Sequence, residues 1–186
     1  MQRLPIAFAL LLLCAAPGAA QRLPTAVVPN HYTLWFAPDL SAATFRGRET
    51  IDVQVKAPSR TITLNAAEIT FRSVIVTSGG RMQRAQVTSD DKAETATFTV
   101  PQAVGVGPAT IQVEFTGILN DKLRGFYLSK AANRRYAVTQ MEATDARRAF
   151  PCFDEPAYKA TFDISLMIDK GNVGCGSCRA KCLAAR

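Results

Sequence analysis

The residues best suited to chemistry lie between Thr139 and Pro156, in the stretch TQMEATDARRAFPCFDEP. These positions hold Gln140, Glu142, two arginines, three further acids, a cysteine and two prolines, without helical or strand periodicity. Charged and aromatic side chains concentrated outside regular structure are typical of a loop that binds a ligand. The carboxylate of Glu142 could accept charge-assisted hydrogen bonds from a cationic group.

A plainer interpretation of Glu142 is a solvated loop acid or an ion-pair partner for an arginine, since surface ion pairs are common and weak. The available arginines are Arg134, Arg135, Arg147 and Arg148. We interpret the remaining charges of the segment structurally, as arginine–carboxylate ion pairs that hold the strand of Gln140 and Glu142 in place. These pairs would involve Arg147, Arg148, Asp154 and Glu155, and Phe150 and Phe153 are expected to pack on the core.

The sequence lacks the residues needed for a zinc site, a serine hydrolase site or a phosphate-binding loop. His31 is the only histidine, so an H-E-x-x-H zinc helix is excluded, and a catalytic zinc needs three protein ligands. No G-x-S-x-G sequence of a serine hydrolase occurs. Gly105 and Gly107 do not form a phosphate loop, because no G-K-[ST] follows. We therefore expect a chain that is not catalytic by itself and binds no metal.

The cysteines leave one metal alternative open. Cys175, Cys178 and Cys182 have spacings that a zinc ion could use, but three thiolates fall short of the usual four ligands, even though Cys152 could join them. Disulfide formation is the preferred reading in an exported protein. We expect Cys152 to be a free, buried cysteine.

The elements that must position this segment are predicted to be strands. Apolar residues alternate with polar ones at 32–36, 51–55, 62–64, 74–76, 96–100, 111–115 and 162–168, with Gly, Pro, Asn or Asp between the runs. Many short strands separated by such residues predict an all-β, antiparallel sandwich or saddle-like domain. No window shows convincing 3.6-residue periodicity, so we expect no long helix.

Residues 1–20 are predicted to be a signal peptide, with Arg3 before an apolar run and cleavage after Ala20. The run is too short to span a bilayer, so no transmembrane segment is expected. The chain is predicted to be exported, secreted or periplasmic, and a lipid anchor on Cys14 is the less favoured alternative.

The net charge of +7 does not predict nucleic-acid binding. Arg3 lies in the predicted signal peptide, and Arg179, Lys181 and Arg186 lie in the last fifteen residues, so the excess over residues 21–171 is only +3. The aromatic residues do not alternate with arginines as a stacking platform for bases requires.

Five segments, in order, resemble the N-terminal β domain of the aminopeptidase N family of zinc exopeptidases. They are residues 23–40, 44–55, 61–69, 115–130 and 139–171, the last being the most specific. The resemblance implies a β domain over 21–171 that recognises the peptide N-terminus. It also implies that Glu142 accepts the α-ammonium group and that Gln140 helps to line the pocket for the first side chain.

The resemblance stops after Gly171. Residues 172–186, NVGCGSCRAKCLAAR, read as a divergent Cys/Arg-rich tail that is expected to be disordered. The resemblance implies that zinc belongs to a catalytic domain missing from this sequence. A premature stop or an incomplete gene model would then leave the sheet incomplete at its C-terminal edge. The alternative function is a secreted β-sandwich binding module with no peptidase role.

Overall fold

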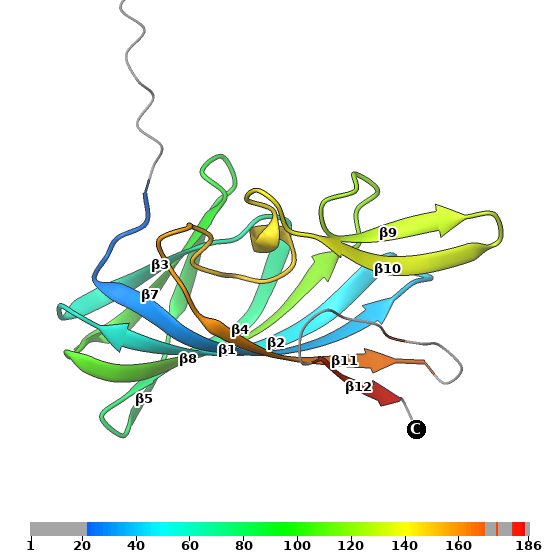
Figure 1. Ribbon diagram of the computed structural model, residues 1–186. Helices are drawn as coiled ribbons and strands as arrows, with labels where there is room; N and C mark the ends of the chain where they lie inside the picture. The colour runs from blue at the N-terminus through cyan, green and yellow to red at the C-terminus, as the bar shows by residue number, and fades with distance from the viewer. Residues whose placement is uncertain (1–21, 170–173, 175–179, 185–186) are drawn as a thin grey trace, which may run out of the picture.

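The computed structural model describes residues 22–169, 174 and 180–184 (Figure 1). The predicted signal peptide at 1–20 and most of the predicted tail, including Cys175 and Cys178, lie outside these residues. The described part of the chain forms strands joined by turns, with one short 3-10 helix and no α-helix. It also contains no helix of the length and apolar character needed to cross a membrane. The prediction of an all-β domain is confirmed.

A seven-stranded sheet forms one layer, in the order β12-β11-β1-β2-β8-β4-β5. Its strands are β1 (Val27–Asp39), β2 (Thr44–Val55), β4 (Ile69–Ser78), β5 (Arg81–Arg84), β8 (Gly107–Ile118), β11 (Thr161–Ile168) and β12 (Ala180–Ala184). Along β2 and β8 buried residues alternate with exposed or half-buried ones, because successive side chains of a strand point to opposite faces. One face of this sheet is therefore the core face.

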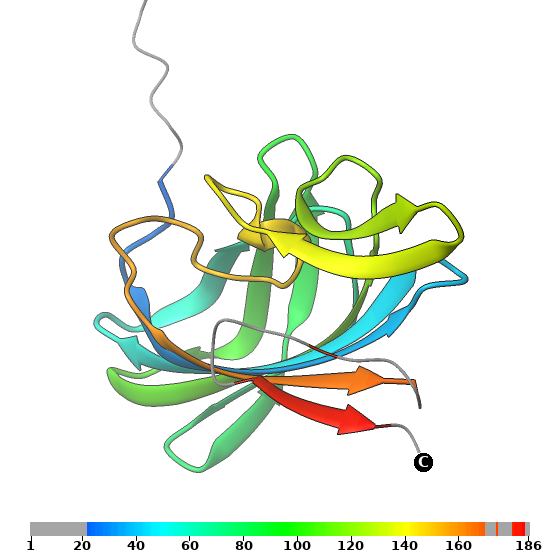
Figure 2. The same cartoon turned by 45° about the vertical axis from the view of Figure 1, so that its right-hand side comes forward.

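Two smaller sheets cover the core face. The first has the order β3-β7-β6, with β3 (Ser59–Asn65), β6 (Gln86–Asp90) and β7 (Thr95–Val104). The second is a hairpin of β9 (Gly125–Ala131) and β10 (Arg134–Gln140). Figures 1 and 2 show both small sheets on the same side of the large curved sheet, with the 3-10 helix η1 (Ala146–Arg148) between them.

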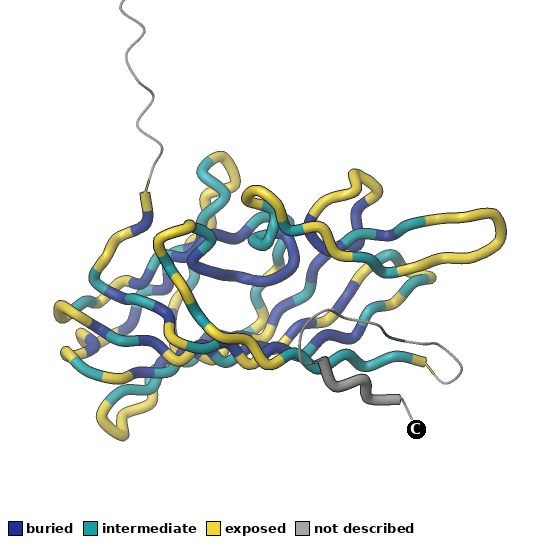
Figure 3. Tube along the Cα trace, in the orientation of Figure 1, coloured by how far each residue is buried: buried dark blue, intermediate teal, exposed yellow. Residues whose placement is uncertain are grey.

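Aromatic rings join these layers in the core. Phe36 of β1 lies 5.6 Å from Phe126 of β9 and 6.3 Å from Phe150, measured between ring centroids. Phe45 of β2 lies 5.0 Å from Phe126. Edge-to-face and tilted ring pairs of this kind stabilise a core beyond their buried area. These contacts attach the hairpin and the segment after η1 to the large sheet. In Figure 3 the buried residues lie between the layers and the exposed residues lie mainly in the loops.

The predicted strands are present, with one difference in burial. Phe162 of β11 is 41% exposed and Ile164 and Leu166 are only half-buried, whereas the alternation predicted a buried face. The reason is that β11 lies outside β1, near the margin of the sheet. It also pairs with β1 in parallel, which requires a long crossover connection, so the sheet is mixed rather than purely antiparallel.

The alternation did not predict β5, β6 or β9, and of β10 only its end at Gln140 was expected to be a strand. Residues 172–186 were expected to be disordered. Within this range the structure describes Gly174 and Ala180–Ala184, and Ala180–Ala184 form β12, which pairs with β11 in parallel.

Candidate functional site

Gln140 and Glu142 lie where the hairpin ends and the chain turns toward η1. Gln140 is the last residue of β10 and pairs with Gly125 of β9. Both Gln140 and Glu142 are exposed. The Glu142 backbone N–H donates to Oε1 of Gln140 at 3.4 Å, and the peptide bond between Glu142 and Ala143 is cis. We call residues 140–145 the site loop.

Local hydrogen bonds close the site loop onto η1. The Asp145 N–H donates to the Met141 carbonyl at 3.0 Å. The Ala149 and Phe150 N–H groups both donate to the Ala146 carbonyl, at 2.9 and 3.1 Å. Short 3-10 turns commonly connect other elements. Here the turn places Arg147 and Arg148 immediately after the site loop in the chain, and Arg148 contacts Asp145 of that loop.

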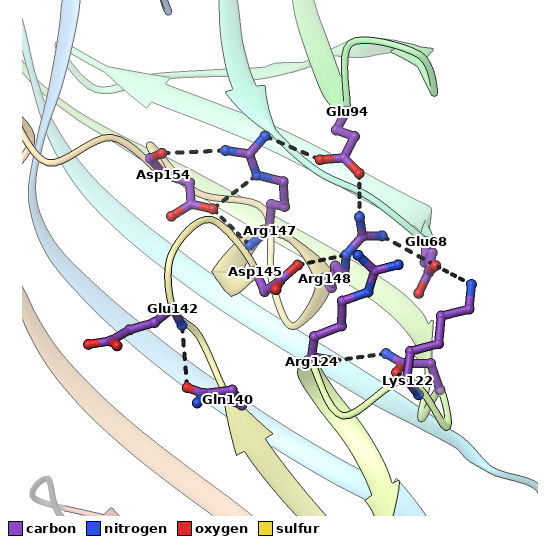
Figure 4. Close-up of polar contacts among 11 residues, drawn as sticks. Glu68, Glu94, Lys122, Arg124, Gln140, Glu142, Asp145, Arg147, Arg148 and Asp154 are labelled. Atoms are coloured by element: carbon purple, nitrogen blue, oxygen red, sulfur yellow. Dashed lines mark hydrogen bonds and ion pairs between the residues drawn. The ribbon is translucent and has the colours of Figure 1, made fainter.

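Two arginines of η1 and four acids around it form a group that we call the arginine cluster: Arg147, Arg148, Glu68, Glu94, Asp145 and Asp154 (Figure 4). Arg147 Nε donates to Asp154 Oδ2 at 3.0 Å, and its Nη1 lies 3.3 Å from Glu94. Arg148 Nε donates to Asp145 Oδ1 at 2.9 Å, and the same guanidinium contacts Glu68 and Glu94. The expected ion pairs of Arg147, Arg148 and Asp154 are therefore present.

Electrostatics hold Arg148 charged in spite of its burial. Burial alone would lower the pKa of its guanidinium. The hydrogen bond to Asp145 and the charges of Glu94 and Glu68 outweigh this effect and raise the pKa above its usual value. A buried arginine surrounded by acids is costly to disturb, because removing one partner leaves charge uncompensated. The arginine cluster is therefore a rigid support for the site loop.

Two members of this cluster could not be found from the local sequence. Glu68 precedes β4 and Glu94 precedes β7, far in sequence from η1. Both adopt left-handed backbone angles, with φ of 59° and 52°, which are uncommon outside glycine and mark tight turns. The only signal in the sequence was an acid at a turn position beside a predicted strand.

Backbone contacts tie the chain after η1 to the rest of the fold. Asn65 of β3 exchanges two backbone hydrogen bonds with Cys152, of 2.8 and 3.0 Å. The Phe153 N–H donates to the Tyr32 hydroxyl at 3.1 Å. Glu155 differs from its prediction: its carboxylate accepts the Leu23 N–H at 2.5 Å rather than an arginine. Phe150 and Phe153 are 7% and 5% exposed, which confirms their packing on the core.

Glu142 is distinct among the acids of this segment. Asp145 and Asp154 bind arginines and Glu155 binds a backbone N–H, whereas the Glu142 carboxylate has no hydrogen bond or ion pair within the described residues. Figure 4 shows its side chain pointing away from the arginine cluster. The ion pairs considered for Glu142 from the sequence are therefore not formed in the described part of the chain.

A hollow of about 270 Å³ lies beside the site loop. Its lining includes Tyr32, Ala143, Cys152 and Tyr158, but neither Gln140 nor Glu142. Burial raises the pKa of the Tyr32 hydroxyl, and burial also raises the pKa of the Cys152 thiol. Both groups are neutral at physiological pH, so the wall they provide is uncharged. Cys152 is free and buried, as predicted.

The described residues do not fit a zinc site. No group of three or more His, Cys, Asp or Glu side chains among them is arranged to hold a metal. The Nδ1 atom of His31 lies 2.7 Å from Thr161 Oγ1, and its Nε2 atom lies 3.5 Å from Asp163. These are the contacts of a polar strand residue. The side chains of Cys175, Cys178 and Cys182 lie outside the description.

Comparison with known families and proteins adds independent evidence. The model of the peptidase M1 N-terminal domain matches residues 28–175. Puromycin-sensitive aminopeptidase of Caenorhabditis elegans is 39% identical over 166 residues, which cover 84% of this chain and 18% of that protein. Aminopeptidase M1-B of Oryza sativa subsp. japonica is 41% identical over 154 residues, covering 79% of this chain and 17% of that protein.

A third relative gives the same picture. Alanine/arginine aminopeptidase of Saccharomyces cerevisiae is 40% identical over 155 residues, which cover 78% of this chain and 18% of that protein. The chain thus spans less than a fifth of the length of each of these relatives. The matched region contains both Gln140 and Glu142, as well as all six members of the arginine cluster.

Proposed function

Because the chain belongs to the peptidase M1 N-terminal domain family, we propose that its site loop recognises the free amino end of a peptide substrate of an aminopeptidase. The observation that carries this proposal is the exposed carboxylate of Glu142, which has no partner among the described residues, whereas the other acids of residues 139–156 each bind an arginine or a backbone N–H. A ligand with a cationic group would supply the partner that Glu142 lacks.

The chemistry suits an exopeptidase. A peptide carries an α-ammonium group only at its first residue, so a fixed carboxylate can distinguish that end from an internal peptide bond. The hydrogen bond between the two charged groups is stronger than a neutral one. Removing the carboxylate from a closed complex would leave the ammonium group unpaired, at a cost of about 2–5 kcal/mol. Gln140, two residues earlier, would contact the first residue of the peptide.

Support for the loop comes from the arginine cluster. Arg148 bonds Asp145 inside the site loop, and Arg147 bonds Asp154 beyond η1. A binding group acts best when packing and further hydrogen bonds fix its position before the ligand arrives. We assign zinc and the activation of water to the remaining length of such an aminopeptidase, because the described residues of this chain do not fit a zinc site.

The test is an NMR titration of the isotope-labelled chain with alanyl-phenylalanine amide and with its N-acetylated form. We expect the free amine to shift the amide signals of the site loop, with weak affinity, and the acetylated peptide to shift them far less. Glu142→Gln should abolish the difference between the two peptides. Asp52→Asn removes an exposed acid from the outer face of β2, on the other side of the large sheet, and should preserve the difference. Equal shifts with both peptides in the unaltered chain would contradict the proposal.

A further inference from the structure

A second candidate site lies on the opposite face of the large sheet, turned away from the site loop. It is a hollow of about 270 Å³ lined by Trp35, Arg46, Gly47, Arg48, Arg72, Glu114 and Phe115. We call it the outer pocket. Arg46, Arg48 and Glu114 are exposed positions that alternate with the buried residues of β2 and β8. Their side chains therefore lie on the outer face.

Sheet register gathers these residues. Trp35 of β1 is directly opposite Arg48 of β2, and Arg48 is opposite Glu114 of β8. On β4, Phe71 pairs with Phe115 and Ser73 with Glu114, so Arg72 is the extra residue of a β-bulge. Bulges redirect a side chain out of the regular alternation. Here the bulge places a third arginine at a pocket built by four adjacent strands.

The charges of the outer pocket are not balanced. Arg48 Nε lies 3.5 Å from Glu114 Oε1, whereas Arg46 and Arg72 make no ion pair within the described residues. Three guanidinium groups thus face one carboxylate. The guanidinium carbons of Arg46 and Arg48 lie 5.9 and 5.1 Å from the centre of the Trp35 ring. Such cation–π contacts orient the arginines in the absence of a ligand.

From this geometry we propose that the outer pocket binds a small phosphate-bearing ligand. Arginine presents a planar fork of N–H donors that matches the oxygens of a phosphate group, and two such forks can share one doubly charged anion. Arg46 and Arg72 are the arginines free to make these bonds. Arg48 would contribute its charge while it remains paired with Glu114. The proposal is independent of the function assigned to the site loop.

The rest of the outer face argues for a small ligand rather than an anionic membrane or polymer. Asp52 lies further along β2 on the same face as Arg46 and Arg48, and Asp163 of β11 is opposite Thr33. Both acids are exposed, so an extended anionic surface laid across the sheet would meet them. The positive region is confined to the end that carries Trp35.

Trp35 gives a direct measurement, because it is the only tryptophan of the chain. We would titrate the whole chain with inorganic pyrophosphate and follow tryptophan fluorescence, with sodium chloride at matched ionic strength as the reference. A saturable change with pyrophosphate alone is expected. In Arg46→Gln/Arg72→Gln the dissociation constant should rise about tenfold or more, since two charge-assisted hydrogen bonds are lost.

The control is Lys130→Gln/Arg134→Gln, which removes the same charge from exposed positions of the β9–β10 hairpin and should leave pyrophosphate affinity unchanged. Vesicles of phosphatidic acid in phosphatidylcholine form the second arm. A response to these vesicles without any response to pyrophosphate would overturn the proposal of a small ligand. Equal affinity in the two double variants, or the same fluorescence change with chloride, would overturn the site itself.

Discussion

Glu49 and Glu142 are two carboxyl groups without partners among the described residues, and their surroundings are opposite. Glu142 is exposed on the site loop, where its charge is solvated and available to a ligand. Glu49 of β2 is 3% exposed, and neither of its carboxyl oxygens has a hydrogen-bond partner within the described residues. Burial raises the pKa of Glu49 well above its usual value of 4.5. The first group suits recognition, whereas the second is a source of instability.

Glu49 predicts a specific pH dependence of stability. Its pKa is higher in the folded state than in the unfolded state, so the folded protein retains the proton to higher pH. The free energy of unfolding should therefore fall as pH rises above about 4.5, by up to about 1.4 kcal/mol per pH unit until the folded-state pKa is passed. Glu49→Gln removes this loss and should gain stability over the unaltered chain as pH increases, in urea unfolding measured between pH 5 and 8.

The matched control is Asp52→Asn, which alters an exposed acid of the same strand on the other face. Its stability should follow that of the unaltered chain at each pH. Tyr32 and Cys152 are the titratable groups close enough to feel the charge of Glu49, and burial keeps both neutral over this range. A pH-independent difference between Glu49→Gln and the unaltered chain would refute the assignment of the buried proton.

At the level of single residues, the sequence predicted the site loop but not the burial of Glu49. The unusual composition of residues 139–156 identified the site loop, and its charges predicted the bonds of Arg147 with Asp154. Glu49 was missed, although extending the alternation of Ile51, Val53 and Val55 backward by one step puts it on the core face. Because glutamate is charged, position 49 interrupts the run of alternating apolar residues. Its burial becomes evident only from the structure, where strands on both sides of β2 enclose it.

At the scale of elements, Gly125 controls how the hairpin meets η1. It begins β9, pairs with Gln140 and has φ of 68°. A Cβ atom added there would lie 2.6 Å from the Cβ of Arg148. Only a residue without a side chain lets η1 approach the hairpin this closely in this conformation. The position of the site loop thus depends on a glycine that carries no chemistry.

Gly125→Ala should therefore reduce the free energy of unfolding by about 2 kcal/mol or more, from left-handed backbone strain together with the contact at Arg148. It should also shift the amide NMR signals of residues 140–148. Gly105→Ala is the control, because nothing lies within 4 Å of the added Cβ there and its φ is not in the left-handed region. Its effect on stability should stay within about 0.5 kcal/mol. Comparable losses in the two variants would show that η1 tolerates displacement.

The predictability of each element follows from its burial. The strands found from the sequence, such as β2, β7 and β8, bury one face and so show period-two alternation. The β9–β10 hairpin was not predicted from the sequence, because Arg134, Arg135 and Tyr136 are all exposed. The first half of β10 therefore shows no alternation of buried and exposed residues. Pairing between distant segments, as in β1 with β11, is set by the packing of the whole chain and has no local signal.

At the scale of the whole molecule, residues 149–153 are where the layers meet. Phe150 packs on Phe36 of the large sheet, Cys152 pairs with Asn65 of the three-stranded sheet, and Phe153 bonds Tyr32. This buried strip continues directly from η1 and the site loop. Residues 149–153 cannot leave the core without breaking contacts in both layers, so we expect the support behind the site loop to open only when the whole fold opens.

Cys152 makes this coupling measurable. Its thiol is 4% exposed, so iodoacetamide should reach it only when the layers separate. Labelling of Cys152, mapped by mass spectrometry, should be about a thousandfold or more slower in buffer than in urea, in proportion to the global unfolding equilibrium. If the junction opens only globally, Gly125→Ala must accelerate Cys152 labelling by the same factor by which it raises the unfolding constant. Rapid labelling of Cys152 in the native chain, or no acceleration in a destabilised Gly125→Ala, would mean that this strip opens on its own, and the rigid support of the site loop would have to be abandoned.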